Sequence, residues 1–149
     1  MKTNPMRILD KLKITYNVYE YNVDDGIDGL SVAEKIGKSA DIVFKTLITK
    51  GKADYYCFVV PVNKELNLDM AAKASGEKSI AMIKQDQLKQ VTGYIKGGCS
   101  PIGMKKNLKT YIDNSCENHY LIIVSAGKIG YQIELKPQDL VKATDATLL

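Results

Sequence analysis

The sequence predicts an α+β fold, with strands and helices mixed along a single domain that spans residues 1–149. Its length lies within the roughly 100 to 200 residues of a typical domain. Segments with apolar residues at every second position, typical of strands, occur among short amphipathic segments that are typical of helices. The two kinds do not alternate regularly, as they would in a doubly wound parallel sheet, so α+β is favoured over α/β.

The first elements follow from local signals near the N-terminus. Asn4 is a suitable N-cap, Pro5 suits the first helical position, and the apolar residues that follow mark one face of a short helix. Apolar and aromatic residues then recur with period two over residues 16–23, which predicts a strand. The Asp-Asp-Gly sequence at residues 24–26 predicts a turn after it.

The middle of the chain predicts a second short helix and a β-hairpin. Ser31 and Glu34 form a capping-box pattern, and Gly37 is a suitable stop for the helix. Residues 42–49 and 55–62 are both rich in β-branched and aromatic residues, and a short polar segment separates them. A hairpin is the simplest interpretation of this pair.

The remaining elements are predicted from caps and short apolar runs. Asn67 is the expected cap of a helix that ends at Gly76, and Asp86 is the expected cap of another that ends at Gly93. Pro137 is expected to begin the last helix. Further strands are expected at residues 79–83, 108–112, 120–124 and 131–135.

The composition is ordinary for a globular protein and excludes several classes. Hydrophobic residues make up 45% and charged residues 26%, and no apolar run approaches the ~20 residues of a membrane helix. The N-terminus lacks a signal-peptide pattern, so a cytoplasmic location is expected. Cys57, Cys99 and Cys116 are odd in number and lack C-x-x-C spacing, which predicts reduced thiols without a disulfide framework or a metal site. No organic cofactor is expected.

Lys45 is the sharpest single candidate for a functional role. Its neighbours on the same strand face are Val43 and Leu47, and the opposite face is also largely apolar. A buried ammonium is costly unless it is paired or binds an anion. The alternative is an edge-strand lysine whose amine reaches water, and periodicity alone leaves the two interpretations equally open.

Two segments further along offer polar groups without bulky side chains. The loop at residues 97–101 contains two consecutive glycines and would expose backbone N–H groups to an anion or oxyanion, although an ordinary turn explains the same residues. Ser125 ends the apolar run 120–124, where its hydroxyl could hydrogen-bond a substrate or simply cap the turn.

Cys99 lies within the glycine loop, but a cysteine nucleophile needs a base or a lowered pKa. The only histidine, His119, lies in a polar stretch without a motif, and no carboxylate pair stands out for acid-base catalysis. These residues therefore give Cys99 no support as a nucleophile. The lysines nearest this loop could meet phosphates or form a solvated face; they are Lys96, Lys105, Lys106 and Lys109.

Taken in order, three segments resemble the YbaK family of aminoacyl-tRNA deacylases, which remove wrongly attached amino acids from proline tRNA. They are the lysine strand at residues 42–48, the glycine loop at residues 93–103 and the Val-Ser-Ala-Gly-Lys turn at residues 124–128. The resemblance extends from about Met6 to Thr144. It implies a mixed, barrel-like sheet surrounded by helices.

The resemblance assigns roles that the residues alone leave open. It implies that Lys45 holds the ester end of the tRNA, either by pairing with a phosphate or by polarising the carbonyl. The residues implied to act in catalysis are Lys45, Gly97, Gly98 and Ser125. Those implied to bind substrate are Tyr21, Thr46, Cys99, Ser100 and Pro101. Relatives more often have an aliphatic residue where Cys99 stands, which implies that it is small pocket lining. The four lysines near the glycine loop are implied to bind tRNA.

The resemblance also implies a mechanism that needs no protein nucleophile. The thiol of a mischarged cysteine attacks its own ester carbonyl and releases free tRNA and a cyclic thiolactone, while the protein supplies positioning and oxyanion stabilisation. The expected substrate is Cys-tRNA(Pro), or Cys-tRNA(Cys). The alternatives are deacylation of Ala-tRNA(Pro) and a non-catalytic RNA-binding or regulatory module. Family members can act beside prolyl-tRNA synthetase, which is therefore a candidate partner.

Two residues near the last segment depart from the family pattern. Relatives often have a basic residue where Ile129 stands and an acidic one where Gln132 stands. Losing both together could mean a lost ion pair, and it opens the question of what contacts the ammonium group of the amino acid. The departures keep the binding-module alternative open and leave the fold prediction unchanged.

Overall fold

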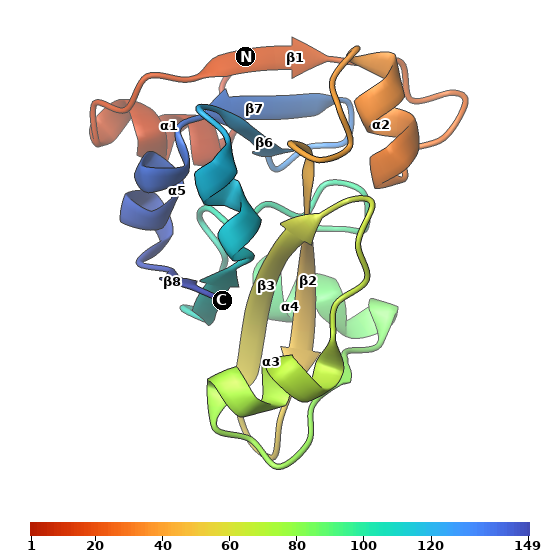
Figure 1. Ribbon diagram of the computed structural model, residues 1–149. Helices are drawn as coiled ribbons and strands as arrows, with labels where there is room; N and C mark the ends of the chain where they lie inside the picture. The colour runs from red at the N-terminus through yellow and green to blue at the C-terminus, as the bar shows by residue number, and fades with distance from the viewer.

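The computed structural model describes residues 1–149 and has the mixed α+β architecture that the sequence predicts (Figure 1). The α-helices are α1 (Asn4–Lys11), α2 (Gly29–Lys35), α3 (Leu68–Ser75), α4 (Leu88–Thr92) and α5 (Pro137–Thr144). Two 3-10 helices are η1 (Gln85–Gln87) and η2 (Asn114–Asn118). The strands are β1 (Asn17–Glu20), β2 (Phe44–Lys50), β3 (Tyr55–Pro61), β4 (Ala81–Met82), β5 (Lys109–Ile112), β6 (Ile122–Ser125), β7 (Tyr131–Leu135) and β8 (Thr147–Leu148).

The strands form two sheets that meet at one point. The smaller sheet has the order β1-β7-β6, and the larger has the order β4-β2-β3-β5-β8. The pairs β3–β5 and β5–β8 are parallel and the others are antiparallel. A single parallel bridge between Val43 and Ile123 joins the two sheets. The sheets are therefore mixed but do not close, and the expectation of a barrel-like sheet holds only loosely.

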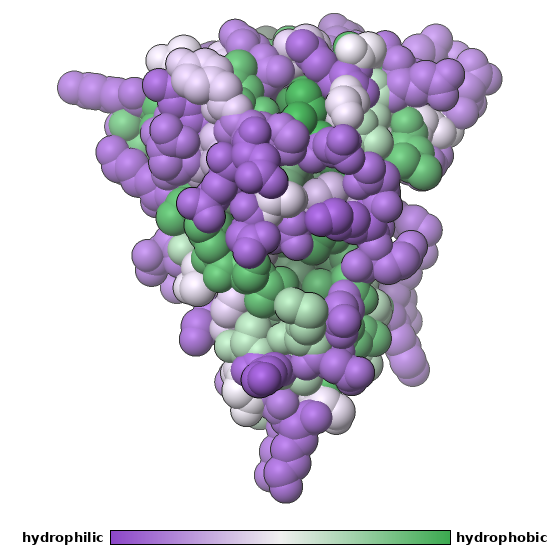
Figure 2. All heavy atoms as spheres, in the orientation of Figure 1, coloured by the Kyte–Doolittle hydropathy of each residue, from purple (hydrophilic) through white to green (hydrophobic).

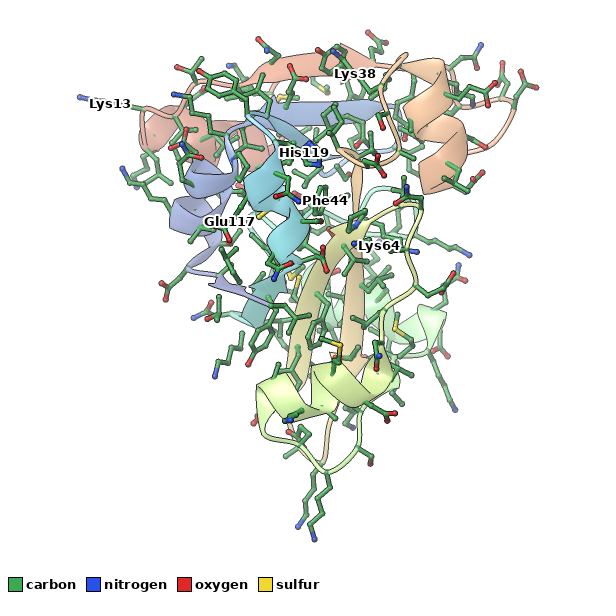
Figure 3. All side chains as sticks on the ribbon, in the orientation of Figure 1. Lys13, Lys38, Phe44, Lys64, Glu117 and His119 are labelled. Carbon is green, nitrogen blue, oxygen red and sulfur yellow. The ribbon has the colours of Figure 1, made fainter.

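The core lies where the two sheets and the terminal helices meet. It includes buried residues from α1, β2, β6, β7 and α5, such as Leu9, Phe44, Val124, Ile133 and Leu140. Figure 1 shows α1 and α5 beside the smaller sheet and α3 across the lower part of the β2–β3 hairpin. Burial of these apolar side chains holds the start of β2 firmly under the smaller sheet, where Phe44 lies in Figure 3.

The predicted hairpin and most of the predicted helices are confirmed, but three cap assignments are wrong. Thr3, not Asn4, caps α1, since its hydroxyl accepts a hydrogen bond from the Met6 amide at 3.5 Å. Asp28, not Ser31, caps α2, which therefore begins before the predicted capping box. Asp86 caps no helix because it lies inside η1, which leads directly into α4.

The chain has no helix with the length and apolar character needed to cross a membrane. Figure 2 shows hydrophilic side chains over most of the viewed face, above all over the smaller sheet. Hydrophobic atoms gather lower down, around the β2–β3 hairpin. The face seen in Figure 2 is thus mostly polar.

Candidate functional site

A hollow of about 630 Å³ lies where β2 diverges from β6 beyond their single bridge. This volume is within the usual range of ligand pockets, roughly 300 to 1,000 Å³. Its walls come from the loop before α2, from α2 itself, the start of β2, the glycine loop and the ends of β6 and β7. The lining residues are Ile27, Asp28, Gly29, Leu30, Val32, Val43, Phe44, Lys45, Thr46, Val62, Lys96, Gly97, Cys99, Ser125 and Gln132.

Another hollow of about 630 Å³ lies between the N-terminal residues and β1. It contains the ion pair between Lys2 and Asp10, whose Nζ and Oδ2 atoms are 2.8 Å apart. None of the residues that the sequence singles out lines it, and its one lysine is already paired with Asp10. The hollow between β2 and β6 is therefore the candidate site.

Lys45 lines this hollow near the start of β2 and is half-buried. No carboxylate lies within ion-pairing distance of its amine, because the chain's only ion pairs involve Lys2, Lys38 and Lys64. A half-buried ammonium without a protein partner is available to an anionic or carbonyl oxygen of a ligand. The start of β2 has β3 on one side only, so Lys45 is on an open strand edge.

The glycine loop is held in shape by its own polar groups. The Tyr94 hydroxyl donates to the Ile102 carbonyl at 2.6 Å, and the Thr92 hydroxyl accepts from the Tyr94 amide at 3.0 Å. Burial raises the pKa of Tyr94 to about 12, so this hydroxyl stays protonated and remains a donor. The loop therefore presents a fixed backbone to the hollow.

The two glycines at the tip of the loop are required for different reasons, Gly97 by its positive φ and Gly98 by lack of space. Gly97 has φ of +86°, and a Cβ there would lie 2.6 Å from Cδ1 of Ile27. A Cβ on Gly98 would lie 3.0 Å from the backbone nitrogen of Ile129. Gly97 lines the hollow, whereas Gly98 packs against the β6–β7 turn behind it. Ile129, the first departure from the family pattern, thus forms the support on which the loop rests.

Ser125 and Gln132 form the opposite wall. They are directly opposed in the β6–β7 register, both are more than nine-tenths buried, and both line the hollow. The Ser125 hydroxyl accepts a hydrogen bond from the Gly127 amide at 3.2 Å, so it does cap the turn. Its own hydrogen is still free to point to a ligand. Gln132, the second departure from the family pattern, places a neutral amide beside it.

Cys99 lines the hollow as a thiol rather than a thiolate. Burial raises its pKa to about 11, and a weaker effect of the Thr92 hydroxyl in the opposite direction does not cancel this. At neutral pH a nucleophile with this pKa would be almost entirely protonated. The geometry supports the small pocket-lining role and gives Cys99 no activating base.

Of the residues expected to bind substrate, Cys99 and Thr46 line the hollow, whereas Ser100, Pro101 and Tyr21 do not. Ser100 is fully buried and its hydroxyl accepts from the Ile102 amide at 3.2 Å, while Pro101 is buried beside it. Tyr21 is buried, and its hydroxyl has no hydrogen-bond partner. Thr46 lines the hollow, but its hydroxyl is buried without a partner.

The four lysines near the glycine loop do not form one compact cluster. Lys96 lines the hollow, and Lys105 lies beside Gly93, whose added Cβ would be 3.5 Å from that of Lys105. The amine of Lys106 lies 5.7 Å from the centre of the Tyr55 ring, and that of Lys109 lies 5.7 Å from the centre of the Tyr111 ring. None of the four has a carboxylate partner.

The sequence reasoning missed the wall formed by the loop before α2. Asp28 accepts hydrogen bonds from the Ser31 hydroxyl at 2.6 Å and from the Ser31 amide at 3.2 Å, and these bonds lower its pKa. Lys35 fixes the same loop by donating to the carbonyls of Asn22 and Gly26, each at 2.6 Å. Asp28 is a good N-cap by residue type, but so is Ser31 three positions later, so the sequence alone does not single out this wall.

The assembled site suits a reaction without a protein nucleophile. It contains an unpaired ammonium, a fixed glycine backbone and a serine hydroxyl around an apolar wall that includes Val32 and Val62. Its one carboxylate, Asp28, accepts two hydrogen bonds from Ser31, and its one thiol is protonated. Such groups can hold and polarise an ester, but they cannot themselves attack it.

The fold and the site are those expected of an aminoacyl-tRNA editing domain, and comparison with known protein families agrees with this. Residues 30–143 match the aminoacyl-tRNA editing domain. This segment is most of the chain and contains Lys45, the glycine loop and Ser125. The chain therefore belongs to the aminoacyl-tRNA editing domain family, which confirms the resemblance drawn from the sequence.

Two known proteins are similar to this chain in sequence. The chain is 45% identical over 146 residues to a protein of Enterococcus faecalis named as the Cys-tRNA(Pro)/Cys-tRNA(Cys) deacylase EbsC, covering 97% of this chain and 89% of that one. It is 26% identical over 102 residues to the proline–tRNA ligase of Staphylococcus aureus, covering 68% of this chain and 18% of the ligase.

A solved structure shows the same fold over the whole chain. A crystal structure described as a trans-editing enzyme for prolyl-tRNA synthetase superimposes with a TM-score of 0.87, covering 100% of this chain and 97% of the other. Sequence identity is 19%, so this likeness bears on the fold alone.

Proposed function

We propose that this protein is a trans-acting aminoacyl-tRNA deacylase that removes cysteine from Cys-tRNA(Pro), or from Cys-tRNA(Cys). The observation that carries the proposal is the hollow in which Lys45, the glycine loop and Ser125 converge without a competent nucleophile or base. The name of the E. faecalis relative supports the same activity, because that protein matches almost the full length of this chain.

The chemistry follows from what the substrate itself supplies. The thiol sulfur of the attached cysteine attacks the ester carbonyl carbon, a C–S bond forms, and the C–O bond to the ribose breaks. The thiol proton ends on the ribose oxygen, so the products are free tRNA and a cyclic thiolactone. Lys45 and the backbone of the glycine loop stabilise the negative charge that develops on the carbonyl oxygen. The fixed walls hold the thiol close to the carbonyl.

The lysines outside the hollow are proposed to contact the tRNA. Lys96 lies at the site itself, and Lys105, Lys106 and Lys109 have no carboxylate partners, so all four are free to meet phosphates. Mischarged tRNA is the proposed partner, in the cytoplasm, with the acceptor end in the hollow. The relationship to proline–tRNA ligase makes the synthetase a candidate partner as well.

Alanine is the competing amino acid. A difference of one small group is worth only ~1 to 3 kcal/mol in a pocket of this kind, or roughly 10- to 200-fold in rate. Alanine lacks a thiol, however, and the hollow has neither a histidine nor a thiolate, while its one carboxylate, Asp28, already accepts two hydrogen bonds from Ser31. We therefore expect the cysteine ester to be cleaved much faster than the alanine ester.

The test is deacylation of tRNA(Pro) charged with cysteine, alanine or proline by the purified protein. Rapid loss of cysteine alone, with thiolactone recovered by mass spectrometry, would support the proposal. 2-Aminobutyryl-tRNA(Pro) is the matched control, because its ethyl side chain is close in size to that of cysteine but has no thiol, and it should resist cleavage. Loss of neither cysteine nor alanine would reject the enzyme and favour the RNA-binding module.

A further inference from the structure

The outer edge of β2 is covered at both ends and open between them. At its start, the Ile123 amide donates to the Ile42 carbonyl at 2.8 Å, and β6 makes its single bridge at Val43. At its end, β4 pairs with Thr49 and Lys50, and the Ile83 amide donates to the Ile48 carbonyl at 3.1 Å. No strand covers the edge between these contacts.

The pairing register shows which residue presents its main chain to this gap. The Val62 amide donates to the Val43 carbonyl at 2.8 Å, and the Gly51 amide donates to the Asp54 carbonyl at 2.9 Å. In an antiparallel pair such bonding residues alternate with residues whose N–H and C=O point away. Lys45 therefore bonds to β3, whereas Thr46 directs both of its main-chain groups to the open edge.

Thr46 and Ser125 would be joined if the parallel bridge continued by one step. That next rung, Lys45 opposite Ser125, is not formed, because β2 and β6 separate to make the hollow. Both Thr46 and Ser125 line the hollow. Main-chain donors and acceptors away from water are almost always paired, so a strand edge that faces a pocket with no strand paired to it is a place for a ligand.

We propose that the aminoacyl group of the substrate pairs with the main chain of Thr46 as if it were one residue of an added strand. The Thr46 N–H donates to the ester carbonyl oxygen, and the Thr46 C=O accepts from the α-amino group. These are the two bonds of an ordinary antiparallel pair. The inference deepens the proposed deacylase function and rests on it.

This arrangement accounts for a pocket that binds an amino group without a free carboxylate. The only carboxylate at the hollow belongs to Asp28, which is occupied by Ser31, and the residue opposite Ser125 is the neutral Gln132. A main-chain carbonyl can accept from the amine whatever its protonation state. The same N–H adds a second donor, beside Lys45, to the carbonyl that the thiol attacks.

A backbone substitution tests the contact directly. An α-hydroxy acid in place of Thr46 replaces its N–H by an ester oxygen and leaves the side chain unchanged. The matched control is the same replacement at Ile48, whose main chain also points away from β3 but which does not line the hollow. Both changes weaken one carbonyl that bonds to β3, so thermal melting should report equal losses of stability.

Single-turnover cleavage of Cys-tRNA(Pro) is then measured for the wild type and both variants. We expect the change at Thr46 to slow cleavage roughly 10- to 100-fold and the change at Ile48 to slow it less than twofold. The wild type should also cleave 3-mercaptopropionyl-tRNA(Pro), which has the thiol but no α-amino group, at least about tenfold more slowly.

The outcomes separate the inference from the function on which it rests. Equal rates for the two backbone variants, with an active wild type, would overturn the Thr46 contact and leave the deacylase intact. Equal rates for the two substrates would overturn the contact to the amino group. A wild type that cleaves neither substrate would reject the proposed function, and the inference would fall with it.

Discussion

Glu134 and Gln132 lie two positions apart on β7, so their side chains share a face of the sheet, yet their surroundings are opposite. Oε1 of Glu134 accepts from Asn17 Nδ2 at 2.9 Å and from the Tyr19 hydroxyl at 3.0 Å. Oε2 lies 3.8 Å from the amine of Lys38, which Figure 3 shows near the smaller sheet. Gln132 is as deeply buried, but it borders the hollow and makes no side-chain hydrogen bond.

The difference separates a residue that stabilises the fold from the wall of the hollow, where binding is proposed. β1 pairs with β7 along both residues, but only Glu134 has a partner for each of its polar groups, so its carboxylate is tolerated in the interior. Where β6 separates from β2, three polar groups line the hollow and form what we call the open wall: the amine of Lys45, the main chain of Thr46 and the amide of Gln132. Substitution of Glu134 should change stability, and substitutions at the open wall should change activity.

The largest expected effect is at the open wall, for Lys45→Ala. Loss of a group that stabilises charge in the transition state lowers kcat by roughly 10²- to 10³-fold. The free energy of unfolding should change by less than about 1 kcal/mol, since the amine has no partner to lose. Single-turnover cleavage of Cys-tRNA(Pro) and urea unfolding measure the two quantities.

Lys64→Ala is the control for this change. Lys64 is an exposed lysine whose amine lies 3.7 Å from Asp113, and Figure 3 shows it beyond the end of β3. A surface ion pair contributes only about 0 to 1 kcal/mol to stability. Its removal should leave cleavage unchanged. If Lys64→Ala slowed cleavage as much as Lys45→Ala does, the catalytic role of Lys45 would be rejected.

The next effect contrasts the two residues of β7 directly. Glu134→Ala leaves Lys38, Asn17 and the Tyr19 hydroxyl without their acceptor and should lower the free energy of unfolding by about 2 to 4 kcal/mol. Cleavage per folded molecule should stay within about twofold of the wild type. Gln132→Ala should lower stability by less than about 1 kcal/mol and slow cleavage roughly tenfold. If Glu134→Ala slowed cleavage and Gln132→Ala lowered stability instead, the contrast between a stabilising residue and a site residue would be rejected.

Much of the fold could be predicted because its signals are local. The β2–β3 hairpin and the Asn67 cap of α3 depend on residues a few positions apart, and both are confirmed. The cap of α2 was misassigned because Asp28 and Ser31 are both good caps, and sequence alone does not rank them. β8 was missed because its two residues are held by pairing with distant β5, not by their own preference.

The candidate site was predictable only in part, for a related reason. Lys45, Gly97 and Ser125 stand out by residue type and by their motifs, and the fold places them at one hollow. The open edge at Thr46 depends on where β6 leaves β2 and where β4 joins it, which no local pattern records. Gln132 was visible only as a departure from a family pattern, and its place opposite Ser125 follows from pairing.

A smaller effect is expected at Cys99, and it tests whether this thiol lines the hollow or acts as a nucleophile. Because burial raises the pKa of its thiol to about 11, alkylation by iodoacetamide should be slow at pH 7 and accelerate about tenfold per pH unit up to pH 10. The raised pKa also means that stability should fall as the pH rises from about 9 towards 11, because the unfolded thiol ionises first. Site-resolved mass spectrometry separates Cys99 from the buried Cys57 and Cys116.

Cys99→Ala should therefore slow cleavage of Cys-tRNA(Pro) less than about tenfold, as expected for the loss of a small lining group. Removal of a protein nucleophile would cost several further orders of magnitude. Rapid alkylation of Cys99 at pH 7 together with complete loss of activity in Cys99→Ala would reject substrate-assisted cleavage and favour covalent catalysis by Cys99.

The smallest effect concerns the lysines outside the hollow. Lys106→Gln removes one cation that is free to meet a phosphate, so it should raise KM about two- to threefold, leave kcat unchanged and reduce the salt dependence of binding by about one ion. Lys13→Gln is the control, since Lys13 is equally exposed but lies at the far end of the smaller sheet in Figure 3. Equal KM values and equal salt slopes for the two variants would place the tRNA on another face of the protein. A fall in kcat for Lys106→Gln would instead show that this lysine acts in the chemical step.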